Sequence, residues 1–306
     1  MTRTPHDQFA KQCMTGFLEP FGKPLVSREI TSEVRQVDVW FEPNPSSAAE
    51  ARQILGLLGR MVEGSCLIEP FRNPVQAVDV RGCLGKLFDV EVELLRQAKR
   101  QKTPLPEADL PRLWILTPTV SKSVWQGFGA VEKEDWSEGM YFLPGHNRCV
   151  LVCIHQLPVS VDTLWLRLLG RGTVQSQAVT ELVALPATHP FKRHTLEQLA
   201  NLRVSLQARQ NLNKDERGLI MSLSPVYERW KEETLQKGIQ EGKQQGKQEQ
   251  RRELLEVFLV NRFGAVDAEM SSLIPTMAQL PDAEFAGLML QMANLSREEL
   301  LERFGG

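Results

Sequence analysis

The sequence predicts a mixed α/β protein that continues into an all-helical C-terminal part. Short apolar runs with a period of two, such as residues 37–41, are typical of strands and lie among segments with helical spacing in residues 1–160. No strand signals follow residue 160. With 306 residues, 42% of them hydrophobic, the chain is long enough to bury a sizeable core and to hold more than one structural unit.

The first part, residues 1–160, is predicted to form an α/β core. Helical spacing predicts helices near residues 5–20, 48–61 and 76–101. Strands are predicted around Asp38 and in the runs LPRLWILTP, GMYFLP and RCVLVCIHQLP, and the apolar stretch SCLIEPF lies between the second and third helices.

The remaining chain is predicted to be helical throughout. Residues 161–224 indicate short helices that extend the core, and from Pro225 a segment of over thirty residues without proline indicates one long helix, residues 225–256. Three glycines in this helix follow a four-residue spacing (Gly238, Gly242 and Gly246). Each glycine inside a helix costs roughly 0.5 to 1 kcal/mol, so their alignment suggests close approach of a second backbone, while the alternative interpretation is a solvated spacer helix. A small helical domain, residues 257–306, follows, and Ser296 with Glu299 predicts a capping box at its last helix.

Charge and hydropathy restrict the partners and the compartment. The net charge is −2, so nucleic acid would have to bind to a local patch rather than through a global basic field. No window approaches 18 uninterrupted apolar residues, and the N-terminal segment lacks the apolar core of a signal peptide. We therefore expect a cytoplasmic protein without a membrane span.

The five cysteines are odd in number and scattered, which disfavours a disulfide framework. Cys149 and Cys153 lie near His146 and His155, so a zinc site is conceivable there. The usual short pairs of cysteine and histidine ligands are missing, however, and buried strand cysteines are the expected interpretation.

Two carboxylates in strand-like runs are the strongest candidates for chemistry. No phosphate-binding loop, dinucleotide fingerprint or nucleophile elbow is present. Asp38 lies in the run VDVWF and Glu69 in the run CLIEPF, where an unpaired buried charge would cost several kcal/mol. If they converge from neighbouring strands, the two residues can hold Mg²⁺ through hard oxygen ligands, and such a metal supports phosphodiester cleavage.

The chain also resembles a known family. The run TPHDQFAKQ, the strand with Asp38, the run LIEPF and the glycine-spaced helix ending in LLEVFLVNRFG are similar to the bacterial recombination-promoting, transposase-like nucleases of the PD-(D/E)XK superfamily, including a C-terminal helical domain of unknown function. The resemblance implies a restriction-endonuclease-like core and a Mg²⁺-dependent DNA endonuclease. It implies that Asp38 and Glu69 are catalytic metal ligands, with Glu33 or Glu29 as a further acidic residue.

The sequence departs from the family pattern at one catalytic position. Two residues after Glu69, where the family has Lys or Gln, this chain has Phe71. Phe71 can neither orient a water molecule nor stabilise an anionic transition state. Arg72 and Lys86 are the nearest basic residues in sequence that could replace the missing lysine.

Other interpretations of the same residues remain open. Asp38 could form a structural ion pair with Arg35 or Arg28, and Glu69 could mark the end of a strand. In that case the α/β core would be a non-catalytic scaffold that self-associates through the long helix or binds a protein partner through its C-terminal helices.

Overall fold

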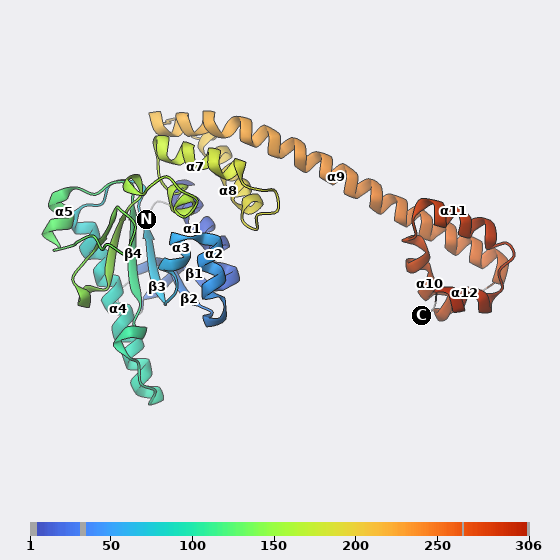
Figure 1. Ribbon diagram of the computed structural model, residues 1–306, viewed down its shortest axis with the longest axis horizontal. Helices are drawn as coiled ribbons and strands as arrows, with labels where there is room; N and C mark the ends of the chain where they lie inside the picture. Colours follow the sequence, from blue (N-terminus) through green and yellow to red (C-terminus); the bar gives the residue numbers. More distant parts are fainter. Residues whose placement is uncertain (1–4, 31–34, 265, 305–306) are drawn as a thin grey trace. The chain divides into compact units, whose positions relative to one another are not determined.

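The computed structural model describes residues 5–30, 35–264 and 266–304 (Figure 1). Contacts divide the chain into two compact units, Met1–Glu228 and Arg229–Gly306. Residues 161–224 pack into the same core as residues 1–160 and belong to the first unit.

The first unit contains a six-stranded mixed sheet with the order β1-β2-β3-β4-β6-β5. Strand β2 is antiparallel to both of its neighbours, β1 and β3; β3, β4 and β6 are parallel, and β5 is antiparallel to β6. The mixed α/β class is therefore confirmed. The strands are β1 (Gly22–Ile30), β2 (Arg35–Pro43), β3 (Cys66–Pro70), β4 (Arg112–Thr117), β5 (Met140–Phe142) and β6 (Cys149–Cys153).

Helices cover both faces of this sheet, and Figure 1 shows it between α4 on one side and α1 to α3 on the other. Strands buried on both faces are apolar at successive positions. In β3, Leu67 packs into the core on the α4 side and Ile68 into the core on the α1 side. The α1-side core takes residues from α1 (Pro5–Leu18), α2 (Ala48–Leu55), α3 (Leu57–Met61), α6 (Leu164–Arg167), α7 (Gly172–Ala184) and α8 (Lys192–Gln207), and the α4-side core takes residues from α4 (Ala77–Gln101) and α5 (Lys122–Gly127).

Two local features differ from the prediction. The helix predicted over residues 48–61 is interrupted at Gly56, whose φ of 55° is strained for any other residue and whose Cβ position lies 2.6 Å from the Asp162 carbonyl oxygen. Strand β1 was not predicted because its sequence, GKPLVSREI, has no apolar alternation. It lies at the edge of the sheet, where a proline is tolerated.

The long helix α9 (Lys214–Phe263) begins earlier than the predicted start at Pro225. The Asn213 amide donates to Glu216 Oε2 at 3.0 Å, and the Glu216 amide donates to Asn213 Oδ1 at 2.9 Å. This reciprocal pair satisfies free donors of the first turn and sets the start of the helix.

The second unit packs the end of α9 against three short helices. Leu255 and Leu259 of α9 are fully buried in its core. The predicted capping box is confirmed, since Ser296 N donates to Glu299 Oε2 at 2.7 Å and Glu299 N donates to Ser296 Oγ at 3.2 Å. The helices are α10 (Ala268–Ala278), α11 (Asp282–Gln291) and α12 (Arg297–Phe304).

Candidate functional site

Asp38 and Glu69 lie side by side on neighbouring strands. The antiparallel register pairs Val39 with Ile68, and one further step places Asp38 opposite Glu69. The Asp38 amide donates to Glu69 Oε1 at 3.2 Å. The sheet therefore brings together two acidic residues that are 31 positions apart in the chain.

Glu69 is the more buried of the two, with 1% of its side chain exposed. Its Oε2 accepts a hydrogen bond from Lys86 Nζ on α4 at 2.7 Å. Burial raises the pKa of Glu69 to about 7; Lys86 opposes this increase and the charge of Asp38 adds to it. Near neutral pH this carboxyl group is therefore poised between its protonated and ionised forms.

Asp38 is paired from the other side of the sheet. Lys11 Nζ on α1 lies 2.6 Å from Asp38 Oδ1 and 3.4 Å from Asp7 Oδ2. Burial is the largest single influence and lowers the pKa of Lys11, but the hydrogen bonds and charges of Asp38 and Asp7 together outweigh it, and the net shift is upward. Asp38, Lys11 and Lys86 retain 18%, 16% and 13% side-chain exposure, so solvent reaches the cluster. Arg28 and Arg35 are the other possible ion-pair partners of Asp38. Their side chains are not among those that the structure describes.

Lys86 is the basic residue that contacts Glu69, and Arg72 is not. Cys83, Leu87 and Val90 form the buried face of α4, and Lys86 lies at its border, from where it reaches the end of β3. Arg72 instead donates to the Gly170 carbonyl oxygen at 3.0 Å. Phe71 packs against the α4-side core and offers no polar group.

The residues present fit a magnesium ion in chemical type. Mg²⁺ is usually held by one or two carboxylates and keeps several water molecules, so Asp38 and Glu69 are suitable ligand types, although the lysines that pair with them come from opposite faces of the sheet. Within the described chain, no group of three or more His, Cys, Asp or Glu side chains is arranged to hold a metal. Glu33 lies outside the described residues, as does the side chain of Glu29.

A pocket of about 410 Å³ opens beside this cluster, between α1, α8 and β1. Asp7 and Lys11 line it, so it shares the lysine that holds Asp38. Two more lining residues, His194 and Gln198, each have a buried side-chain atom, Nε2 and Oε1, without a hydrogen-bond partner in the described chain. The sequence offered no signal for this pocket, because its residues come from three separate elements.

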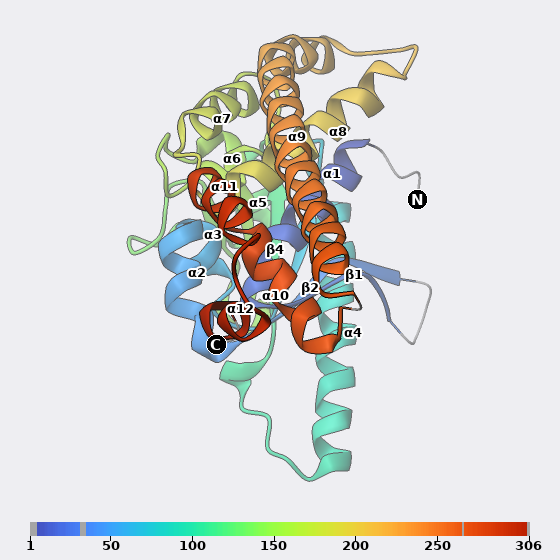
Figure 2. The ribbon, with the colours of Figure 1, turned by 90° about the vertical axis from the view of Figure 1, so that its right-hand side faces the viewer.

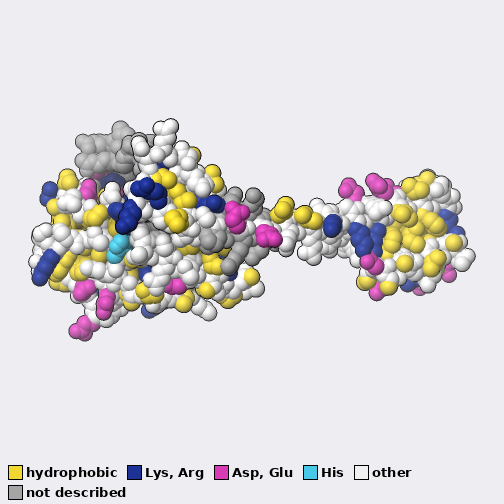
Figure 3. All heavy atoms as spheres, turned by 90° about the horizontal axis from the view of Figure 1, so that it is seen from above, with side chains coloured by type: hydrophobic (Ala, Val, Ile, Leu, Met, Phe, Trp, Pro, Cys, Tyr) yellow, Lys and Arg dark blue, Asp and Glu magenta, His cyan; other side chains and the backbone are white. Residues whose placement is uncertain are grey.

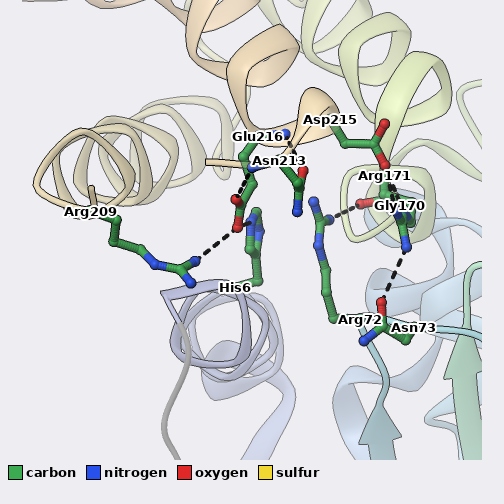
Figure 4. Close-up of polar contacts among 9 residues, drawn as sticks. All are labelled: His6, Arg72, Asn73, Gly170, Arg171, Arg209, Asn213, Asp215 and Glu216. Carbon is green, nitrogen blue, oxygen red and sulfur yellow. Dashed lines mark hydrogen bonds and ion pairs between the residues drawn. The ribbon is translucent and has the colours of Figure 1, made fainter. Parts of the chain in front are cut away.

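A second polar cluster, here called the arginine network, joins α1, the loop after β3, the start of α7 and the α8–α9 connection (Figure 4). Arg171 donates to Asp215 Oδ2 from Nε at 2.8 Å and from Nη2 at 2.6 Å. Glu216 accepts from Arg209 Nη1 at 2.9 Å, and His6 Nε2 lies 3.6 Å from its Oε1. The network comprises His6, Arg72, Asn73, Gly170, Arg171, Arg209, Asn213, Asp215 and Glu216.

The protonation states of the network indicate a structural role. Burial, assisted by Arg72, lowers the pKa of His6 to about 4, so this imidazole is neutral at pH 7. Hydrogen bonds from Arg171 lower the pKa of Asp215, which stabilises its ionised form. The network thus joins separate segments of the chain, with His6 neutral where it is buried and Asp215 ionised where it pairs with Arg171.

Cys149 and Cys153 lie in the α4-side core, and no set of three or more metal ligands forms around them among the described residues. All five cysteines are free and buried, and burial raises the pKa of Cys149 and of Cys153, which disfavours the thiolate that zinc requires. His146 is exposed and contacts Glu107 at 3.0 Å, whereas His155 Nε2 accepts from the Arg171 amide at 3.4 Å. The interpretation as buried strand cysteines agrees with these positions.

Comparison of the chain with protein-family models, with curated proteins and with solved structures finds no match. Over the described residues, the structure contains no helix with the length and apolar character needed to cross a membrane.

Proposed function

We propose that the protein is a magnesium-dependent DNA endonuclease in which Asp38 and Glu69 hold the metal and Lys86 replaces the missing motif lysine. The observation that carries this proposal is the position of Glu69, a buried carboxylate between the Asp38 amide and Lys86 Nζ. A carboxyl group with a raised pKa beside a second carboxylate and a lysine is typical of functional sites.

Bound Mg²⁺ would activate a water molecule and neutralise charge that develops on the phosphate. The chain's own groups have distinct roles. Glu69 has to be ionised to act as a ligand, and Lys86 Nζ favours that form by donating to Oε2. The ammonium group of Lys86 also stabilises negative charge on a scissile phosphate held next to Glu69. Lys11 keeps Asp38 in place and supplies a second cation for the DNA backbone.

The test is cleavage of plasmid DNA by the full chain with MgCl₂, compared with Asp38→Asn and Glu69→Gln. The control is Glu134→Gln, which changes an exposed carboxylate between α5 and β5. Both site variants are expected to lose at least about 100-fold in rate and the control to retain the wild-type rate. Absence of cleavage by the wild-type protein, or equal rates for all four proteins, would refute the nuclease proposal.

Titration with Mg²⁺, followed by calorimetry, separates metal binding from catalysis. Saturable binding that Asp38→Asn abolishes is expected. Because Glu69 has to lose its proton, the affinity for Mg²⁺ should rise with pH up to about 7.

A second candidate function is self-association through α9, with the α/β core as a scaffold. Leu235, Ile239 and Val257 are 61%, 50% and 62% exposed, and helical spacing places them on one stripe with Gly242 and Gly246. A Cβ atom added at either glycine would meet nothing within 4 Å, so this face is open in the single chain. Figure 3 shows hydrophobic side chains gathered on the surface of the C-terminal unit as well.

Light scattering tests this second candidate. The full chain is expected at twice 34.6 kDa, and Leu235→Glu with Ile239→Glu at the monomer mass. Gln244→Glu, which adds one charge at another exposed position of α9, is the control. A wild-type monomer would rule out the stripe as a dimer contact.

A further inference from the structure

A pocket of about 710 Å³ lies at the opposite end of the parallel strands from Glu69. Ser65 and Arg112, at the starts of β3 and β4, line it, together with Glu42 near the end of β2. Its volume is within the range of small-molecule sites, which is about 300 to 1,000 Å³. It shares no lining residue with the Asp38–Glu69 site.

Three cations in the wall of this pocket form no close ion pair among the described residues, although Arg148 interacts electrostatically with Glu91. Arg148 donates only to neutral carbonyl oxygens, those of Pro111 at 3.1 Å, Ala108 at 3.3 Å and Leu110. Lys133 Nζ lies 4.6 Å from the centre of the Phe142 ring and forms no ion pair there. Arg112 contacts the Trp114 ring, 5.7 Å from its centre, and its guanidinium group makes no hydrogen bond in the described chain.

Within the described part of the chain, Arg112 itself lacks a compensating charge in contact with it, although the pocket wall also contains the carboxylates of Glu42, Glu63 and Asp109. Burial and the neighbouring Arg148 lower the pKa of Arg112, which means that its positive charge is poorly compensated. The Glu63 carboxylate, also in the wall, lies 3.4 Å from Arg52. Glu42 accepts a hydrogen bond from Trp40 Nε1 at 2.9 Å.

The pocket wall also contains an aromatic surface with an unused donor. Trp114 is 1% exposed, and its Nε1 has no acceptor in the part of the chain that the structure describes. Buried indole N–H groups usually have a partner. Trp136 lies beside it, with ring centres 5.6 Å apart, and the Arg60 guanidinium covers Trp136 at 3.8 Å. A ligand here would therefore meet cations next to an apolar aromatic wall.

We propose that this pocket binds a phosphate monoester of a small organic group, with the phosphate against Arg112, Lys133 and Arg148 and the organic group against Trp114 and Trp136. A phosphate monoester carries a charge near −2 at neutral pH and three strong acceptor oxygens, which suits several uncompensated cations better than a single carboxylate does. The volume accommodates a ligand of the size of a nucleoside monophosphate.

Calorimetric titration of the full chain with AMP tests the proposal, in buffer with EDTA so that metal-dependent cleavage has no part in the result. Ribose 5-phosphate and adenosine separate the contributions of the phosphate and of the base. Saturable binding of AMP and of ribose 5-phosphate, but not of adenosine, is expected.

Two variants and a control locate the site. Arg112→Gln is expected to raise the Kd for AMP roughly tenfold, and Lys133→Gln roughly threefold, because each removes one charged donor. Lys133 is exposed, so its variant remains informative if Arg112→Gln fails to fold. Lys122→Gln, an exposed lysine on α5 that does not line the pocket, should leave the Kd unchanged. Absence of saturable binding, equal binding of adenosine, or an unchanged Kd in Lys133→Gln would overturn the proposal.

Discussion

The Asp38–Glu69 site and the arginine network both lie near the same end of β3, yet their surroundings shift the pKa values of their carboxyl groups in opposite directions. In the network, hydrogen bonds from Arg171 lower the pKa of Asp215, so its ionised form is stabilised. In the site, burial raises the pKa of Glu69 to about 7, although Lys86 donates to it at 2.7 Å. Only three positions separate Glu69 from Arg72, which belongs to the network.

This difference separates a structural cluster from a candidate functional one. A carboxylate stabilised in its ionised form lowers the free energy of the folded chain at neutral pH, which is what an ion pair between helices should do. A carboxylate that folding makes harder to ionise lowers stability there and is ready to exchange a proton for a metal ion. On this basis we assign the network to the scaffold and propose the Asp38–Glu69 site as the functional one.

The largest expected effect is on the rate of DNA cleavage. It tests whether Lys86 or Arg72 is the basic residue that acts together with Glu69. Lys86→Ala should lower the cleavage rate by roughly 10²- to 10³-fold, because it removes the cation in contact with Glu69 Oε2. Lys99→Ala, an exposed lysine of the same helix, should have no effect. If Arg72→Ala lowered the rate and Lys86→Ala did not, the assignment of the two basic residues would be reversed.

The next effect is on stability and concerns the network. Glu216 is 5% exposed, and Glu216→Ala would leave Arg209 without its carboxylate and remove a cap of α9. Because the Arg209 side chain is 44% exposed, most of the loss comes from the removed cap and the vacated buried position, and it should be roughly 1 to 3 kcal/mol. Unfolding in urea, monitored by hydrogen exchange of the amides in α1 and α8, measures this loss of stability in the first unit. Glu232→Ala, exposed on the same helix, is the control, and an equal loss in both would contradict the role of the network.

A third effect is the pH dependence that Glu69 contributes. Because the pKa of Glu69 rises from 4.5 to about 7 on folding, the folded chain holds this proton more tightly than the unfolded chain does. The free energy of unfolding should therefore fall as the pH rises from about 4.5 to 7. Relative to Glu69→Gln, the wild-type protein should lose roughly 1 to 3 kcal/mol over that range. If the free energies of unfolding of the two proteins, measured in urea, changed with pH in the same way, the pKa of Glu69 would not be raised on folding.

The smallest effect concerns the more exposed edge of the network. The side chains of Arg171 and Asp215 are 30% and 32% exposed, so solvent screens their pairing. Asp215→Asn should cost at most about 1 kcal/mol at pH 7. Because the pKa of Asp215 is lowered on folding, this contribution is present above about pH 4 and is lost as the pH falls through the folded value. A loss as large as that of Glu216→Ala, in the same urea assay, would place Asp215 among the buried determinants of the fold.

Local sequence was sufficient for much of the fold. The apolar runs of β4, β5 and β6, the helix over residues 77–101 and the Ser296–Glu299 capping box depend on residues a few positions apart. The same holds for the choice of Asp38 and Glu69, because a carboxylate in an apolar strand is conspicuous without any knowledge of its neighbours. By contrast, β1 has no such local pattern and is held in the sheet by its pairing with β2.

The sequence by itself determined the class of the fold, the helical tail and the two acidic residues that deserve a test. Only the tertiary structure decided that Lys11 contacts Asp38, and that Lys86 rather than Arg72 contacts Glu69. It also decided that Arg112 and Lys133 line one pocket at the other end of the parallel strands. The reason is that periodicity and capping are interactions between near neighbours in the chain. Pairing between side chains from different strands and helices depends on how the layers pack, which no short run of residues encodes.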